Sequence, residues 1–275
     1  MSTNQASAES VFSLAGRTAN KINSLRVSQE AIDQAIQNSD HPYWKAIEGV
    51  FNPSLQLVEV TEPRAELPPI LTSTGSTFGE WLKAREELHK FFVGESIVLR
   101  DEFEMTDELL ARTDIMPVFR PIGATNRMAI NWKKKLNVNV WEEVDAMWYK
   151  NSKGPKVPQL SFIARSERPD ENTLGENAKS PDGLIRMELL KGASWLNLYG
   201  WADADTLYFA ITGKHLDPKD TVTWFPEDRL PDGNVVRGKG YAGYDGVGFH
   251  WYNSGYCDPC VGARLATHLP LKPKS

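Results

Sequence analysis

The chain has 275 residues, of which 41% are hydrophobic and 24% are charged, and its formal net charge at pH 7 is −5. This composition is that of a globular protein with enough apolar residues for a sizeable core, in one large domain or two smaller ones. The negative charge argues against a nucleic-acid-binding surface, and no apolar run has the roughly eighteen residues of a membrane span. Residues 1–25 lack the basic and apolar parts of a signal peptide, and two cysteines make no disulfide framework, so we expect a cytoplasmic protein.

The first half of the chain has helical patterns. Residues 1–73 are predicted to form a polar, partly helical extension that ends in a proline-containing linker. Thr77, with Glu80 three residues later, has the capping-box spacing that begins a helix, here FGEWLKAREELHKFF. Thr106 is placed to cap a second, shorter helix. We therefore expect residues 74–150 to be mostly helical and to pack on the core formed by the rest of the chain.

After Pro158 the sequence favours strands. The segments LSFIA, SWLNLYGW and TLYFAIT are rich in β-branched and aromatic residues. The last two are expected to pair as an antiparallel hairpin, because only the short polar stretch ADAD separates them. Asp203 and Asp205 would then lie in an exposed turn, with a cation site as the alternative. Helices followed by strands indicate an α+β protein.

The segment 240–268 has an unusual composition. It contains no Lys, Glu, Gln or Met, although these types account for 17, 20, 6 and 6 of the 275 residues, respectively. What remains is a framework of Gly, Val, Phe and Trp that carries Tyr, Asp, His, Asn, Ser and Cys. Antibody combining sites have a similar composition, in which Tyr supplies rigid contacts and Ser, Gly and Asn supply adaptable hydrogen bonds. The alternative interpretation is a Gly- and Tyr-rich strand pair that packs on the core.

The genetic code suggests a cause for this bias. When the adenines of Asn codons that end in a pyrimidine are randomised, the products include Tyr, His, Asp, Ser, Cys, Gly, Pro and Ala. They never include Lys, Glu, Gln, Met or Trp. The residues of this segment that fit the set include Tyr241, Tyr244, Asp245, His250 and every residue from Tyr252 to Cys260. Trp251 does not fit, and we interpret it as fixed framework.

On these residues the sequence resembles the variable proteins of diversity-generating retroelements. In these bacterial systems a reverse transcriptase rewrites a C-terminal coding segment at template adenines, and the segment typically closes with a motif such as Gly-Phe-Arg-Leu-Ala. This chain has Gly-Ala-Arg-Leu-Ala at 262–266, with Ala263 where an aromatic residue often stands. Similarity extends upstream through 224–230 and 195–211 to RTDIMPVFRPIGATNRMAINWK and STFGEWLKAREELHKFF, so that it covers residues 74–268.

The resemblance implies a C-type lectin-like fold with a helical N-terminal portion, often in the variant shared with formylglycine-generating enzymes. The lectin-like region would span 151–270 and would display a variable segment, 240–260, on one solvent face of a small antiparallel sheet. The implied function is recognition of an unknown protein or small-molecule ligand, without enzymatic activity, cofactor, metal or nucleic acid. The framework residues are expected to be Trp201, Phe249, Trp251 and Arg264. The ligand-binding residues are expected to be Tyr241, Tyr244, Asp245, His250, Tyr252, Asn253, Ser254, Tyr256, Cys257, Asp258 and Cys260.

Other patterns suggest different functions. Residues 238–243 match the dinucleotide fingerprint GxGxxG, but that site requires a helix at the third glycine, and GVGFHWYNSGY has no helical pattern. Cys257 and Cys260 form a CxxC pair, for which zinc, redox and disulfide roles are alternatives; a zinc site would also need His250 and His268. Two further alternatives are an enzyme of the formylglycine-generating or lectin-like type with a cysteine nucleophile, and a structural domain with a Tyr-rich core.

Overall fold

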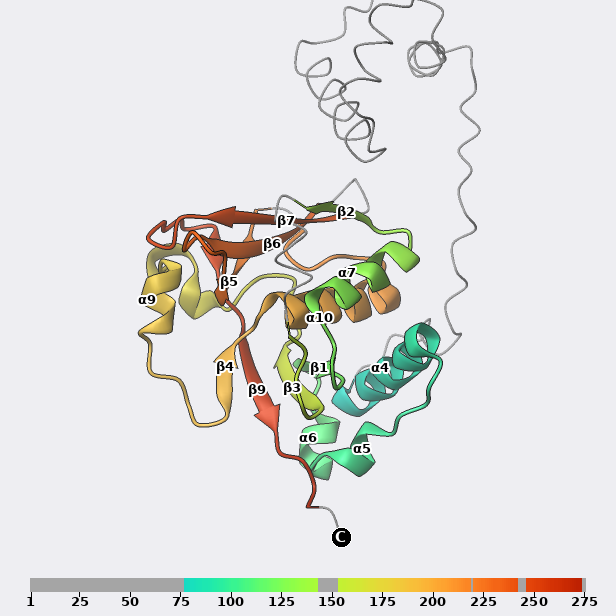
Figure 1. The fold of residues 1–275 in the computed structure, drawn as a ribbon. Helices are drawn as coiled ribbons and strands as arrows, with labels where there is room; N and C mark the ends of the chain where they lie inside the picture. The colour runs from blue at the N-terminus through green and yellow to red at the C-terminus, as the bar shows by residue number, and fades with distance from the viewer. Residues whose placement is uncertain (1–76, 143–152, 219, 242–245, 274–275) are drawn as a thin grey trace, which may run out of the picture. The chain divides into compact units, whose positions relative to one another are not determined.

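The computed structural model describes residues 77–142, 153–218, 220–241 and 246–273, so the predicted extension 1–73 lies outside the described residues. All described residues belong to one compact unit, Pro63–Ser275. This unit contains two sheets and several helices (Figure 1), which makes the protein α+β, as predicted. None of the described helices combines the length and the apolar composition needed to cross a lipid bilayer.

The region before residue 143 is mostly helical but also supplies a strand to each sheet. Its described elements are α4 (Phe78–Val93), α5 (Leu99–Glu102), α6 (Asp107–Ala111), β1 (Ile115–Arg120), α7 (Asn126–Lys135) and β2 (Asn139–Glu142). The predicted capping box is confirmed: the Thr77 hydroxyl accepts a hydrogen bond from the Glu80 amide (3.3 Å), and the Glu80 carboxylate accepts one from the Thr77 amide (2.9 Å). The Thr106 hydroxyl caps α6 by accepting from the Leu109 amide. These local signals are readable because a cap depends on residues three apart.

The remaining described elements are seven strands, three short helical segments and the fifteen-residue helix α10. They are β3 (Gln159–Ala164), η2 (Glu171–Thr173), η3 (Gly175–Asn177), α9 (Pro181–Ile185), β4 (Ala193–Trp195), α10 (Leu198–Thr212), β5 (Val222–Arg229), β6 (Val235–Tyr241), β7 (Gly246–Tyr252), β8 (Val261–Gly262) and β9 (Leu265–Leu269). The strand predicted for LSFIA is β3. The polar segment after it contains η2, η3 and α9.

The strands form two sheets. The first has the order β1-β3-β9-β4, with every neighbouring pair antiparallel, so that β9 lies between two strands formed earlier in the chain. The second has the order β2-β7-β6-β5-β8. Its centre is the β6–β7 hairpin, whose register runs from Val235 opposite Tyr252 to Tyr241 opposite Gly246. The edge strands β2 and β8 pair in parallel with β7 and β5.

The helix α10 occupies the place where a strand hairpin was expected, and that prediction is wrong. Twelve of its fifteen residues are buried, so its apolar residues surround the helix and show no one-sided helical period. Its ends carry the signals that decide the structure. The Asn197 side chain accepts a hydrogen bond from the Gly200 amide (2.8 Å), and Gly213 closes the helix in the left-handed conformation. Only Ala193–Trp195, before the helix, forms a strand.

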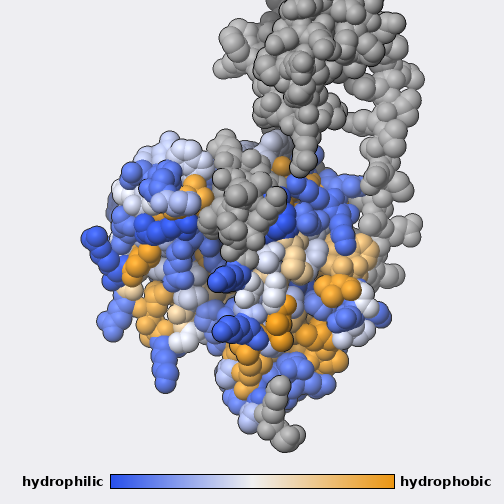
Figure 2. All heavy atoms as spheres, viewed as in Figure 1, coloured by the Kyte–Doolittle hydropathy of each residue, from blue (hydrophilic) through white to orange (hydrophobic). Residues whose placement is uncertain are grey.

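The core lies around α10, which packs against both sheets. On one side Trp201 contacts the rings of Phe225 and Phe249 in the second sheet. On the other side the Asp203 carboxylate accepts a hydrogen bond from the Phe119 amide of β1 (3.0 Å). Figure 1 shows α10 between the two sheets, with α7 beside it. In the same view, Figure 2 shows hydrophobic residues gathered around α4, α5 and α6. The upper left of the surface is largely hydrophilic.

Asp203 and Asp205 are buried in α10, which excludes the exposed turn predicted for them. Asp203 pairs with Arg85 of α4 (2.8 Å). Asp205 pairs with Lys133 of α7 (2.5 Å) and with the Nδ1 atom of His215 (2.9 Å). Burial alone would raise the pKa of Asp205, but the Lys133 charge and the His215 hydrogen bond lower that pKa to about 2. The two carboxylates therefore bind protein cations and connect α10 to its neighbouring helices.

Candidate ligand-binding face

The second sheet has an inner face toward α10 and an outer face away from it. On the inner face, Phe249 contacts Trp201, and a Cβ atom at Gly238 would lie 2.8 Å from the Phe225 ring. Because side chains alternate along a strand, the residues between them point to the opposite side. We define the outer face as Trp141 of β2, Arg237, Lys239 and Tyr241 of β6, His250 and Tyr252 of β7, and Tyr256 of the following loop.

Two glycines of β7 let aromatic rings lie close to the outer face. A Cβ atom at Gly248 would be 2.7 Å from both the Tyr241 ring and the His250 Nε2 atom, and one at Gly246 would be 2.5 Å from the Trp141 ring. The Tyr241 hydroxyl and His250 Nε2 form a hydrogen bond of 2.8 Å. Tyr241 also packs edge-to-face on Trp141, with 5.1 Å between ring centroids. The result is a connected row of three rings across β2, β6 and β7.

A second group of rings surrounds Arg237. Its guanidinium carbon lies 4.5 Å from the centroid of the Tyr252 ring and 5.8 Å from that of the buried Trp224. The Tyr252 ring in turn lies 4.6 Å from the ring of Tyr256. On the same strand, Lys239 Nζ lies 5.8 Å from the Tyr241 centroid. Cations and aromatic rings thus alternate across the outer face. Each cation is attracted electrostatically to the faces of the neighbouring rings.

The loop 253–260 is held by hydrogen bonds of its own. Asp258 accepts from the Tyr256 hydroxyl (2.8 Å) and from the Cys260 amide (2.7 Å). These bonds lower the pKa of Asp258 below its ordinary value, and the bond from Tyr256 raises the pKa of that phenol. The Ser254 hydroxyl donates to Asp182 (2.9 Å), which also pairs with Arg229 (2.6 Å). The loop therefore presents Tyr256 in a defined position beside Tyr252.

The predicted ligand-binding residues within the described chain are exposed or partly exposed. Tyr252, Asn253, Cys257 and Cys260 are exposed, and none of the others is buried. Partly exposed residues are Tyr241, His250, Ser254, Tyr256 and Asp258. Tyr244 and Asp245 lie outside the described residues. The described part of this segment therefore does not form a Tyr-rich packed core.

Three of the four predicted framework residues are buried, and one is not. Trp201, Phe249 and Arg264 are almost completely inaccessible to solvent, but Trp251 is 43% exposed. Trp251, which was expected to belong to the framework, therefore does not pack into the core as the other three do. Alternation does put Trp251 on the same face as Phe249, but β2 pairs with β7 only from Gly246 to Phe249. The described sheet thus has no neighbour for Trp251 on that edge, and alternation alone does not bury a ring.

Three residues of the outer face were missed in the sequence. Trp141, Arg237 and Lys239 all lie before the segment 240–260. For the two cations the signal was present: in VVRGKGY, Arg237, Lys239 and Tyr241 occupy alternate positions and therefore share a face of any strand. Trp141 had no comparable signal, because its place next to Tyr241 depends on the parallel pairing of β2 with β7.

The other sequence patterns find no matching geometry. Gly238 and Gly240 lie within the strand β6, not before a helix, and Gly243 falls outside the described residues. Cys257 and Cys260 are free thiols on the surface. Within the described ranges, no group of three or more His, Cys, Asp or Glu side chains is arranged to hold a metal ion.

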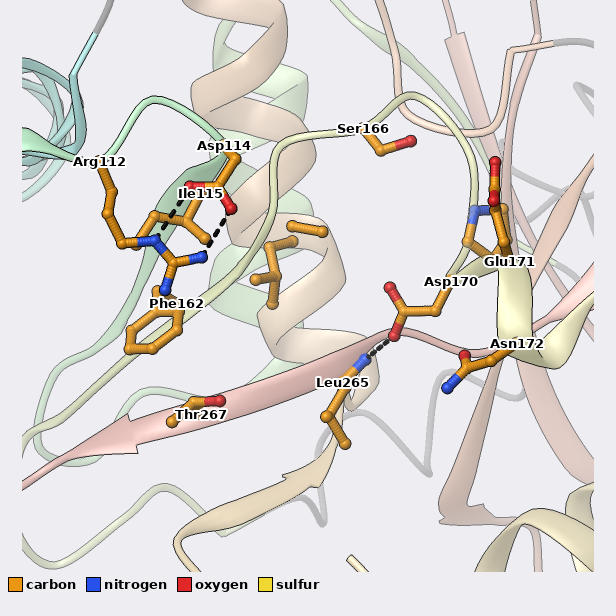
Figure 3. Close-up of a pocket in the computed structure, with 13 residues that line it drawn as sticks. Arg112, Asp114, Ile115, Phe162, Ser166, Asp170, Glu171, Asn172, Leu265 and Thr267 are labelled. Atoms are coloured by element: carbon orange, nitrogen blue, oxygen red, sulfur yellow. Dashed lines mark hydrogen bonds and ion pairs between the residues drawn. The ribbon is translucent and has the colours of Figure 1, made fainter. Parts of the chain in front are cut away.

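A cavity of about 540 Å³ opens next to the first sheet (Figure 3). Phe162, Leu265 and Asp170 are among its lining residues. Three of its four charged groups already have protein partners: Arg112 binds both oxygens of Asp114 (2.9 and 2.6 Å), and Asp170 accepts from the Leu265 amide (2.6 Å). Burial raises the pKa of Asp170, although this hydrogen bond opposes the shift.

Comparison of the chain with protein families, curated proteins and solved structures finds no match.

Proposed function

We propose that the protein is a recognition protein that binds its ligand through the outer face and the adjoining loop 253–260, and that it is not an enzyme. The observation that carries this proposal is the gathering of Trp141, Tyr241, Tyr252 and Tyr256 on one face, with Trp141 41% and Tyr252 42% exposed. Tyrosine and tryptophan dominate the binding energy of many interfaces. Holding such rings in place before binding reduces the entropy lost when the complex forms.

We propose further that a retroelement reverse transcriptase diversifies this segment. Support comes from the alternation within β7. Of its residues, His250 and Tyr252 fit the set expected from randomised Asn codons and lie on the outer face, whereas Val247 and Phe249 pack against the core. Substitution of the outer residues would leave the core unchanged. The packing of α10 on the inner face of an antiparallel hairpin also suits the C-type lectin-like fold, which is part of this proposal.

The genetic part of the proposal has a direct test in genome sequence. A second, imperfect copy of the coding segment for residues 240–266 is expected near the gene, next to a gene for a reverse transcriptase. The two copies should differ only where the second copy has adenine. Differences from the gene at positions where the second copy has any of the four bases would contradict diversification but not ligand binding. The same holds for a locus without a reverse transcriptase gene.

The binding part is tested with peptides selected on the intact chain from a random display library. The double variant Tyr252→Ser/Tyr256→Ser should lose binding at least tenfold, with little change in melting temperature because both rings lie at the surface. Leu190→Ser is the control, since Leu190 is an exposed apolar residue outside the outer face. Equal loss in both variants, or loss in neither, would disprove the proposed binding face.

A further inference from the structure

Arg237 has an unusual position for a charged group on a sheet. Its guanidinium lies between the rings of Tyr252 and Trp224, and its Nε atom is buried without a hydrogen-bond partner. In the described part of the chain it forms no ion pair. The charge of Arg237 lowers the pKa of Asp258, but it contributes less than the hydrogen bonds from the Cys260 amide and the Tyr256 hydroxyl do. The Asp258 oxygens bind the Tyr256 hydroxyl and the Cys260 amide instead.

Lys239 repeats this situation two residues along β6. It projects from the same face, about 7 Å from Arg237 along the strand. Its ammonium group lies near the Tyr241 ring, and it too has no ion-pair partner in the described ranges. A guanidinium fixed between rings retains the planar donor edge that receives a carboxylate with two hydrogen bonds. Two neighbouring cations without carboxylates form an electrostatic surface that is complementary to an acidic ligand.

The surroundings indicate which anion fits. A nucleic acid presents phosphates in a row and is bound by many cations together, whereas this face has two cations among aromatic rings on a chain of net charge −5. A ligand with single carboxylates next to apolar side chains fits two cations among aromatic rings better than a row of phosphates does. Such groups occur in protein segments that contain Asp or Glu beside hydrophobic residues.

We propose that Arg237 and Lys239 form a constant receptor for acidic side chains within the outer face, and that the partner is an acidic segment of another protein. This inference rests on the proposed ligand-binding function. Both cations precede the segment 240–260, and so does Trp224, which lies directly opposite Arg237 on the neighbouring strand β5. Rewriting of the segment would therefore change the rings around the cations while the preference for a carboxylate persists.

The test uses twelve-residue random peptides displayed on phage and selected on the immobilised full chain. Selected peptides should be enriched in Asp and Glu relative to the library. Replacing the acidic residue of a selected peptide by its amide should weaken binding at least tenfold. In the protein, Arg237→Gln should cause a similar loss, and Lys239→Gln a loss of about threefold. Arg237→Lys should be intermediate because it keeps the charge but loses the planar donor edge. Arg100→Gln removes an equal charge at an exposed position in α5 and should leave binding unchanged.

The outcomes separate this inference from the proposed function. Selected peptides that depend on Tyr252 and Tyr256 but show no acidic preference would overturn the carboxylate receptor and leave the binding face intact. Peptides that ignore both sets of substitutions would overturn both proposals, and a selection without any binder counts against both. Displacement of the peptide by inorganic phosphate or a single-stranded oligonucleotide at equal ionic strength would assign the cations to phosphate. If Arg237→Gln lowers the melting temperature, Lys239→Gln and the amide peptides still decide the question.

Discussion

Arg264 and Asp217 form a fully buried ion pair, with 2.9 Å between Nη2 and Oδ1. Arg264 comes from the Gly-Ala-Arg-Leu-Ala motif that follows the outer-face loop. It also donates to the backbone carbonyls of Ser166 (2.9 Å) and Glu167 (3.1 Å). Asp217 further accepts from the Trp201 indole (2.8 Å). The motif residue therefore connects β9 to α10 and to the loop after β3.

Arg264→Gln should destabilise the protein by about 3–5 kcal/mol, because the change leaves Asp217 buried without its cation. Chemical denaturation at neutral pH measures this loss. Arg100→Gln, which removes an exposed arginine that pairs with Asp107, should change stability by about 0.5 kcal/mol or less. Similar values for the two variants would show that the buried network contributes little.

Acid should weaken the fold through Asp205. Its pKa is about 2 in the folded protein, below the ordinary value of 3.8, so the unfolded chain takes up the proton first as the pH falls. The stability from this group is complete above pH 4 and decreases by about 2 kcal/mol toward pH 2. Unfolding free energies at pH 4.5 and 2.5 should therefore differ more in the wild type than in Asp205→Asn. Equal differences would contradict the role of the Lys133 and His215 contacts.

Phe249 and Trp251 should respond differently to truncation, although they share a face of β7. Phe249→Ala should cost about 3–5 kcal/mol, as for other buried aromatic rings. Trp251→Ala should cost about 1 kcal/mol, because its ring is 43% exposed and leaves no closed cavity. Thermal and denaturant unfolding of the two variants provides the comparison. A larger loss for Trp251→Ala would place its ring in a packed environment.

Gly248→Ala should disturb the outer face more than the fold. The added methyl group would meet the Tyr241 ring and His250 Nε2, both at 2.7 Å, and these side-chain ends can move aside. The Tyr241–His250 hydrogen bond should then break, which is visible in the ¹⁵N chemical shifts of the His250 ring. Stability should fall by about 1 kcal/mol. Unchanged His250 shifts in Gly248→Ala would mean that the rings do not lie against the glycine.

The double variant Cys257→Ser/Cys260→Ser should unfold at the wild-type temperature, because both thiols are exposed and free. The melting temperature of the wild-type chain should likewise be insensitive to reductant and to chelator. A clear drop in the double variant would indicate a disulfide or a metal that stabilises the loop.

The sequence predicted those features that depend on neighbouring residues. The capping box at Thr77, the cap at Thr106, the strand at LSFIA and the exposure of the residues after Tyr252 follow from spacing, composition and codon set. It failed for α10, because a helix that is buried all round resembles a strand in its aromatic and β-branched content. Asp203 and Asp205 were misplaced together with the helix. Their partners, Arg85 and Lys133, are more than seventy residues away in the chain, so no local pattern indicates these ion pairs.

The candidate site was predictable only in part. Codon composition located the residues on β7 and in the loop, but it carries no information about strands outside the segment. Arg237 and Lys239 join them through the hairpin register, and Trp141 joins through a parallel pairing that spans about a hundred residues. Such long-range pairings depend on the packing of the whole unit around α10.

The position of β9 between β3 and β4 has a consequence for protein synthesis. The first sheet cannot assemble until residues 265–269 have left the ribosome, and by then the whole outer face has been translated. A frameshift or stop codon within residues 240–260 removes β9 as well as the loop. Damaged products would then expose unpaired strands and be open to proteolysis. The topology thus restricts folding to chains in which residues 240–260 have been translated completely and in frame.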